Sequence, residues 1–154
     1  MFKTIATAAV TTAALMAASN AVQASDNSDT LKVQGNVAAV CTVDVEDYGV
    51  RLDLVKGADG KAIGEITETC NDADGYTITL ASSEGGNMVN GKAKVAYTID
   101  YDTVSGQSLG KEQSLTRKSA AYGDAHELAV NIDGDFERVA GAYADTITVT
   151  IAAN

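Results

Sequence analysis

The stretch Leu31-Lys-Val-Gln-Gly-Asn-Val-Ala-Ala-Val-Cys-Thr-Val-Asp-Val45 decides the fold class of this chain. Small and apolar residues occupy the odd positions, and most of the even positions between them are polar. A period of two places alternate side chains on opposite faces, so the pattern predicts extended β structure with one buried face. The run is far longer than a usual strand of about five or six residues. We therefore expect either a bend at Gly35 or two strands with different roles.

Shorter alternating segments follow along the rest of the chain, at 50–54, 63–70, 76–80, 93–101, 128–132 and 143–151. Segments rich in glycine, aspartate and asparagine separate them and are typical of turns, at 57–60, 71–75, 84–87 and 133–135. The polar residues 103–124 predict a long connection with at most one short edge strand. Because no segment after the leader has an apolar stripe of helical period, the sequence predicts seven or so strands in an antiparallel β-sandwich.

Composition and charge exclude several classes of function. The chain of 154 residues has 21 acidic and 11 basic residues, a formal net charge of −10, which argues against nucleic-acid binding. The single histidine, His126, excludes multi-histidine metal sites, and we expect it to be exposed or at a sheet edge. The acidic pairs at 72/74, 100/102 and 133/135 indicate solvated turns and strand faces rather than a glycosidase site. We expect no catalytic site and no cofactor; Asp72-Ala-Asp74-Gly75 lacks the other acids of an EF-hand, so only a loose surface calcium site stays open.

Residues 1–24 have the features of a secretory signal peptide. Lys3 precedes a short apolar stretch, and Val22-Gln-Ala24 is typical of a cleavage site. Removing 24 of the 154 residues leaves 130, which is enough for one domain with a sizeable core. Export places Cys41 and Cys70 in an oxidising compartment, where two isolated cysteines most often form a disulfide. We therefore predict a structural Cys41–Cys70 bond.

The two ends of the exported chain resemble the pilin subunits of the chaperone–usher pathway. Residues 31–41 look like the N-terminal extension of such a subunit where it enters the first strand, and a second cysteine follows about thirty residues later. The ending Gly141-Ala-Tyr-Ala-Asp-Thr146, followed by alternating apolar residues, is similar to archaic pilins and to the related spore-coat-U-type secreted domains. The likeness spans nearly all of the chain after residue 24.

The resemblance implies an incomplete immunoglobulin-like antiparallel sandwich that is completed by donor-strand exchange. Residues 25–40 would be the N-terminal extension, and 41–154 the pilin domain. A periplasmic chaperone would fill the open groove in transit, and at an outer-membrane usher the extension of the next subunit would replace it. The inward-facing donor residues would be Leu31, Val33, Gly35, Val37 and Ala39. The last strand would border the groove with Tyr143, Ile147, Val149 and Ile151.

The resulting hypothesis is a non-enzymatic subunit that polymerises with identical copies into a fimbria at the cell surface and supports adhesion or biofilm formation. The main alternative is a monomeric secreted binding module with the same fold, in which 31–45 is simply a first strand. A third hypothesis is a carbohydrate-active enzyme that uses a carboxylate pair. A monomer that is stable without a chaperone would favour the binding module, and turnover that is lost when one acidic pair is mutated would favour the enzyme.

Overall fold

A computed structural model describes residues 27–154, so the predicted signal peptide lies outside the described residues. Residues 27–40 contain no strand, and all ten strands belong to the compact unit of residues 36–154. The strands are β1 (Cys41–Asp47), β2 (Ala58–Cys70), β3 (Tyr76–Ser82), β4 (Asn87–Asn90), β5 (Ala93–Ala96), β6 (Thr98–Tyr101), β7 (Val104–Ser108), β8 (Gln113–Arg117), β9 (Ala121–Ile132) and β10 (Ile147–Ala153). Among the described residues, no helix is long and apolar enough to cross a membrane.

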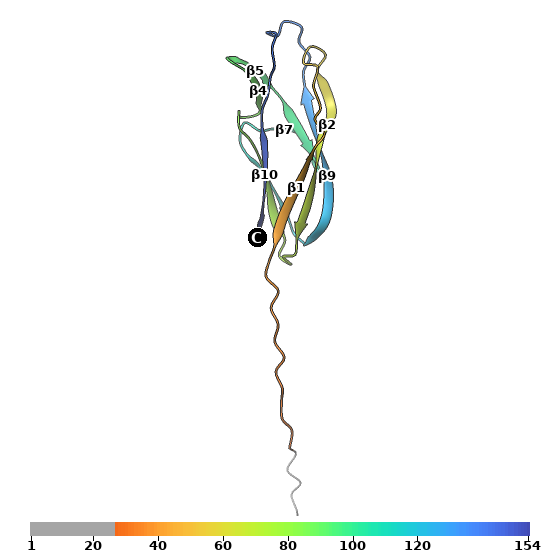
Figure 1. The fold of residues 1–154 in the computed structure, drawn as a ribbon, viewed down its shortest axis with the longest axis vertical. Helices are drawn as coiled ribbons and strands as arrows, with labels where there is room; N and C mark the ends of the chain where they lie inside the picture. The colour runs from red at the N-terminus through yellow and green to blue at the C-terminus, as the bar shows by residue number, and fades with distance from the viewer. Residues whose placement is uncertain (1–26) are drawn as a thin grey trace, which may run out of the picture. The chain divides into compact units, whose positions relative to one another are not determined.

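The strands form two main sheets and one separate hairpin (Figure 1). The larger sheet has the order β1-β2-β9-β6-β7, the smaller one has the order β10-β3-β8, and β4 pairs with β5. Every pairing is antiparallel, which confirms the predicted all-β antiparallel sandwich. We call the end where β1 and β3 begin and β10 finishes the disulfide end. The loop end is the opposite end, formed by residues 48–57 and 133–146.

The core lies between the two sheets and follows the predicted alternation. The inward positions of β3 are Tyr76, Ile78 and Leu80, all buried, and the residues between them are only half buried. The larger sheet faces them with Ile66, Ile99, Leu128 and Val130, which are also buried. Burying such side chains between two sheets is the main favourable contribution to folding.

Four segments of the chain differ from the prediction. The alternating segment 50–54, expected as a strand, contains no strand, and its last residue enters the turn at 54–56. Residues 57–60, expected as a turn, include the start of β2, and register shifts against β9 mark irregular pairing there. Gly60 adopts positive φ at this irregular pairing, which marks a β-bulge. Gly57, also of positive φ, closes the preceding turn, where its backbone N–H donates to the carbonyl of Asp53. The segment 93–101 is divided at Tyr97 between β5 and β6, which lie in different sheets. Residues 103–124 contain β7, β8 and the start of β9; β7 and β8 are edge strands that bury little, so their sequences lack a strong apolar pattern.

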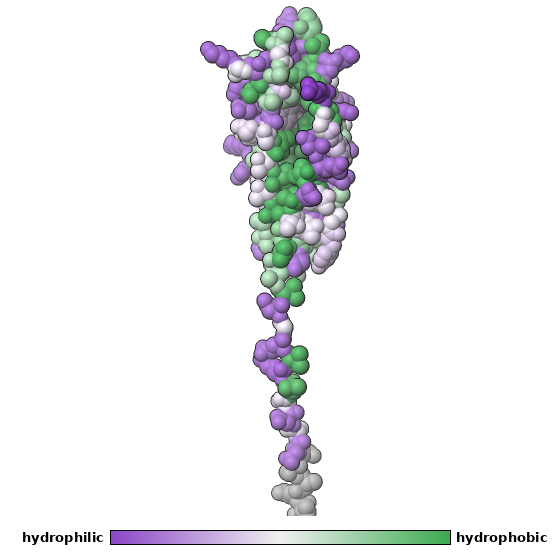
Figure 2. All heavy atoms as spheres, viewed as in Figure 1, coloured by the Kyte–Doolittle hydropathy of each residue, from purple (hydrophilic) through white to green (hydrophobic). Residues whose placement is uncertain are grey.

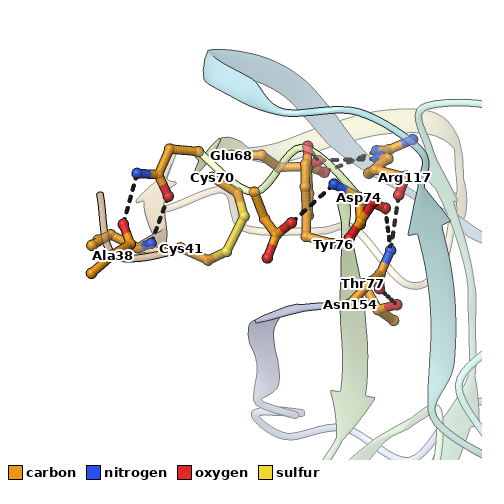
Figure 3. The surroundings of a disulfide bond; sticks show 12 residues. Ala38, Cys41, Glu68, Cys70, Asp74, Tyr76, Thr77, Arg117 and Asn154 are labelled. Atoms are coloured by element: carbon orange, nitrogen blue, oxygen red, sulfur yellow. Dashed lines mark hydrogen bonds and ion pairs between the residues drawn. A yellow bond between two sulfur atoms is a disulfide. The ribbon is translucent and has the colours of Figure 1, made fainter. Parts of the chain in front are cut away.

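The predicted disulfide is confirmed. Cys41 begins β1 and Cys70 ends β2, and the two residues are directly opposite each other in the antiparallel ladder. Cys70 is fully buried against Tyr76 and Ala121. Figure 3 shows that the bond ties the beginning of the domain to the turn that leads into β3.

Replacing both cysteines with serine should lower the free energy of unfolding by about 3 kcal/mol, because the unfolded chain loses the restriction of a 29-residue loop. Urea unfolding measures the difference, with the wild type and the double variant either both free or both bound to the same partner. Two free thiols in the mass spectrum of the unreduced wild-type protein would contradict the assignment.

Candidate functional site

An open groove separates the outer edges of β1 and β10. β1 is the edge strand of the larger sheet and β10 is the edge strand of the smaller sheet, and the two lie side by side without pairing. Each therefore presents a row of backbone N–H and C=O groups that no neighbouring strand uses. Figure 2 shows a band of apolar side chains along this face of the domain.

The burial of β10 shows that a layer is missing over the groove. Its odd positions face inward but are only half buried: Ile147, Val149 and Ile151. The inward side chains of β3, the neighbouring strand in the same sheet, are fully buried. On the other wall, Val43 is half buried and Val45 is 49% exposed. Both walls therefore have inward-facing apolar side chains that the domain itself does not cover.

Towards the loop end, a cavity of about 430 Å³ opens between the two sheets. Its apolar lining comes from both sides: Val45, Leu52, Ile63, Met88, Tyr143 and Ile147. Val149 and Ile151 lie further along β10, towards the disulfide end. The lining and the strand edges together suit an extended apolar segment, because such a segment can pair its backbone with a strand edge while alternate side chains enter the groove.

Asp145 anchors the start of β10 beside the cavity. Its carboxylate accepts hydrogen bonds from the hydroxyls of Ser82 at 2.5 Å, Ser83 at 2.8 Å and Tyr97 at 2.6 Å, and from the backbone N–H of Glu84 at 3.1 Å. Burial alone would raise the pKa of Asp145, but these hydrogen bonds outweigh it and hold the pKa below its ordinary value. The aspartate of the ending 141–146 thus fixes where the last strand begins.

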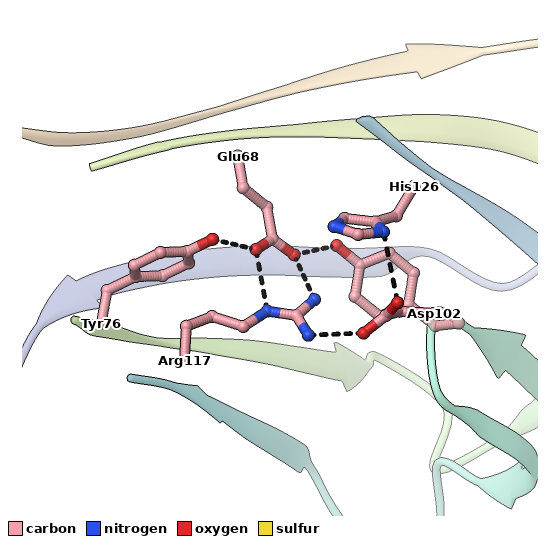
Figure 4. Close-up of polar contacts among 6 residues, drawn as sticks. Glu68, Tyr76, Asp102, Arg117 and His126 are labelled. Atoms are coloured by element: carbon pink, nitrogen blue, oxygen red, sulfur yellow. Dashed lines mark hydrogen bonds and ion pairs between the residues drawn. The ribbon is translucent and has the colours of Figure 1, made fainter. Parts of the chain in front are cut away.

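A second polar cluster joins the two sheets near the disulfide end (Figure 4). Glu68 of β2 is completely buried, and Arg117 of β8 donates to its carboxylate from Nε at 3.0 Å and from Nη2 at 2.9 Å. The hydroxyls of Tyr76 in β3 and Tyr101 in β6 donate to the same carboxylate. Burial would raise the pKa of Glu68, but the bonds from Arg117 and the two tyrosines lower it below its ordinary value. The cluster connects strands of both sheets.

Asp102 and His126 extend this cluster. Nη1 of Arg117 donates to Oδ2 of Asp102 at 2.5 Å, and Nδ1 of His126 lies 3.4 Å from Oδ1 of the same carboxylate. The ring of His126 packs edge-on against Tyr101, with 5.8 Å between the ring centroids. His126 is therefore half buried within a polar network, where the sequence had predicted an exposed or edge position. The charged and polar side chains of the cluster use one another as hydrogen-bond and ion-pair partners, which indicates that the cluster is a structural cross-link between the sheets.

The predicted donor residues precede β1 and are exposed: Leu31, Val33, Gly35, Val37 and Ala39. Leu31 is 92% exposed, and no atom lies within 4 Å of a Cβ built on Gly35. Tyr143 does not belong to the last strand, which begins at Ile147, because the backbone of the next residue, Ala144, pairs with Val89 of β4 instead of with β3. The hydroxyl of Tyr143 donates to the carbonyl of Val139 at 2.8 Å. It nonetheless lines the cavity.

Sequence reasoning missed the Glu68 cluster, although one signal was available. Glu68 lies two residues from both Ile66 and Cys70, so in a strand all three side chains face the core. The alternation therefore predicted a carboxylate in the core. Its partners come from three other strands, and no local pattern brings them together. Of the acidic pairs, Asp133 and Asp135 are exposed as predicted, whereas Asp100 and Asp102 are hydrogen-bonded. Within residues 27–154, no three His, Cys, Asp or Glu side chains are grouped so as to hold a metal ion.

The buried carboxylate predicts an acid-sensitive domain. Because the folded-state pKa of Glu68 is lower than the ordinary value of 4.5, its ionised form stabilises the fold above that pH, and this contribution is lost as pH falls through the folded-state pKa. Glu68→Gln should lower the free energy of unfolding at pH 7 by roughly 3 kcal/mol and flatten its dependence on pH below 4.5. Urea unfolding at several pH values measures both effects, with the exposed Glu112→Gln as control. An unchanged pH dependence in Glu68→Gln would contradict this role.

The two faces of β10 predict opposite responses to a charge. Val149→Asp places an unpaired carboxylate on the groove face and should abolish folding. Thr148→Asp adds the same charge on the exposed face and should leave the yield of folded protein unchanged. The amounts of soluble, folded protein recovered for the two variants measure the difference. Wild-type yield of Val149→Asp would show that the inward face of β10 is assigned wrongly.

Comparison with known proteins identifies the family. Residues 27–150 match the Spore Coat Protein U domain. No curated protein matches the chain. A solved structure that is similar is the E. coli Hda pilus minor tip subunit, HdaB, at 14% sequence identity and a TM-score of 0.37, with 71% of this chain and 79% of that chain covered. Because the domain match spans nearly all of the described residues, the chain belongs to the Spore Coat Protein U domain family, the branch of the chaperone–usher pilins that its sequence resembles.

Proposed function

We propose that this protein is a structural pilus subunit that polymerises with identical copies by donor-strand exchange. The observation that carries the proposal is the groove between β1 and β10, whose walls both leave apolar side chains half buried. The chain also has an apolar alternation in residues 31–39 that no strand of its own domain covers. The groove has apolar side chains that nothing in the domain covers, and residues 31–39 have apolar side chains that nothing in the domain buries. Residues 31–39 of one copy can therefore cover the groove of another.

Residues 31–39 can pair with the groove in the way that any strand adds to the edge of a sheet. An added strand forms backbone hydrogen bonds with the free edge of β10 and places alternate side chains in the groove. Leu31, Val33 and Val37 are between 85% and 92% exposed in the free subunit, so their burial removes apolar surface from water. Burial of the whole set contributes on the order of 4–10 kcal/mol before the costs of ordering the segment.

The extension would enter the groove of a second copy rather than its own groove. To lie beside its own β10, the chain would have to reverse direction just before β1. Hydrogen bonds between Asn71 and the backbone of Ala38 and Val40 hold this segment extended. The connection to β1 therefore favours complementation between subunits, which builds a chain of identical copies.

The proposal assigns partners and a route. After export and removal of residues 1–24, a periplasmic chaperone would cover the groove, since an exposed apolar edge favours aggregation. An outer-membrane usher would exchange the chaperone for the extension of the next subunit, and the fibre would support adhesion or biofilm formation at the cell surface. This function needs no catalytic residue, cofactor or nucleic acid.

A chain that begins at Val40 tests the proposal. It should aggregate when expressed alone, should be soluble when a chaperone or a 25–40 peptide fills its groove, and should form no fibre because it cannot cover a neighbour. Solubility, size-exclusion chromatography and electron microscopy measure these outcomes. A soluble, stable monomer of the truncated chain would favour the secreted binding module instead.

A paired substitution in the full chain is the control for this experiment. Gly35→Leu meets no atom in the free subunit, so it should leave the chaperone complex intact while it slows or blocks assembly at a tight position of the groove. Asn36→Leu adds the same side chain at the next position, which faces away from the groove, and should assemble normally. Equal assembly rates for the two variants would contradict the assigned donor face.

A further inference from the structure

We infer that the side chains of Val55, Phe136 and Val139 form a contact surface for a second copy of this chain, the next subunit in the fibre. The inference rests on the proposed function and adds a contact between whole domains to the donor strand. The three side chains are 57%, 83% and 64% exposed, respectively. Exposed apolar side chains that cluster on one surface are typical of sites where proteins associate.

The two segments that carry the three residues are joined at the loop end. The backbone N–H of Asp135 donates to the carbonyl of Leu54 at 3.3 Å, and Nε of Arg138 donates to the same carbonyl at 3.0 Å. These bonds join the segment of Val55 to the segment of Phe136 and Val139. The hydroxyl of Tyr143, which lines the groove, is bonded to the carbonyl of Val139. The surface is therefore continuous with the end of the groove where the cavity lies.

Strand directions determine which end of the domain meets the neighbour. β1 begins at the disulfide end, so the extension of each copy leaves its domain there. β10 runs from the loop end to the disulfide end, where the backbone N–H of Asn154 donates to the carbonyl of Gly75 (Figure 3 shows the contacts of Asn154). A donor segment antiparallel to β10 places its own domain beyond the loop end of the acceptor. The parallel orientation would place that domain at the disulfide end, where the acceptor's own extension leaves.

The link between two neighbouring domains is short because Asn71 holds its end. Oδ1 of Asn71 accepts the backbone N–H of Val40 at 2.6 Å, and Nδ2 donates to the carbonyl of Ala38 at 3.0 Å. The backbone N–H of Asn71 also donates to the carbonyl of Val40, at 3.2 Å. Residues 38–40 thus stay with their own domain, and the free donor segment ends at Val37. Of the five donor residues expected from the sequence, Ala39 is thus placed in the link by this inference, and the other four are free to enter the groove.

The shortness of this link keeps neighbouring domains close together. Three extended residues span about 10 Å, so the link keeps the disulfide end of one subunit within about that distance of the loop end of the next. The apolar surface is positioned to be covered there. Charged side chains surround it, among them Asp53, Asp133, Asp135, Glu137 and Arg138. An apolar centre with a polar rim is typical of protein interfaces, whereas the excess of acids disfavours an anionic membrane surface.

Site-specific photocrosslinking in assembled fibres of the full chain tests the inference. A benzophenone amino acid at position 136 should capture the neighbouring subunit through its disulfide end, residues 71–75 or 118–124. The same probe at Ser114, an exposed position of β8 away from the loop end, is the control and should give several-fold less crosslinked dimer. Mass spectrometry of the crosslinked peptides identifies the partner residues.

Substitutions provide a second readout by electron microscopy. Phe136→Glu should widen the distribution of angles between consecutive subunits, and Phe136→Leu, which keeps the surface apolar, should retain the wild-type distribution. If Phe136→Glu prevents assembly, a chaperone complex of normal yield combined with crosslinking at 136 in wild-type fibres supports the inference. Fibres that show neither a crosslink at 136 nor an altered angle would overturn the contact and leave donor-strand exchange intact. A wild-type chain that forms no fibre would overturn both.

Discussion

The structure depends on the fact that β10 has a hydrogen-bonding partner on one side only. β3 pairs with one edge of β10, and the other edge faces the groove towards β1. The odd side chains of β10 are inward-facing yet half exposed, so the core of the smaller sheet ends one strand early. A sandwich with this defect loses part of the apolar burial that a complete one would have. The open groove beside β10 follows from that unpaired edge.

Specific polar cross-links hold the incomplete sandwich in register. Glu68 and Arg117 connect the two sheets near the disulfide end, and Asp145 secures β10 to the end of β3 near the loop end. A buried ion pair adds little net stability compared with a well-packed apolar pair, but the loss of one partner is costly. Such pairs therefore suit a role in fixing one arrangement of the sheets, and together with the disulfide they keep both walls of the groove in place while it is unfilled.

The run 31–45 has one sequence pattern but two different structures. Its second half forms β1 and contributes Val43 and Val45 to the groove wall, whereas its first half has no strand partner in its own domain. The change occurs at residues 38–40, where Asn71 binds the backbone. A side-chain amide has a donor and an acceptor, like the backbone of a neighbouring strand. Asn71 therefore extends the pairing of β1 back to Ala38. The described residues before Ala38 have no such bonds to Asn71.

The sequence by itself determined the β class, the antiparallel sandwich, the disulfide and the family, because each rests on local alternation, on residue type or on a short ending. It also placed the apolar face of β3 on the correct parity. Only the tertiary structure decided which positive-φ glycines belong to a bulge in β2, where Tyr97 separates β5 from β6, and that β7 and β8 are edge strands. It also decided that Glu68 meets Arg117, Tyr76 and Tyr101, and that β1 and β10 leave a groove between them. The physical reason is that these features depend on pairing between residues far apart in the chain, whereas the period of a sequence reports only which face a side chain occupies.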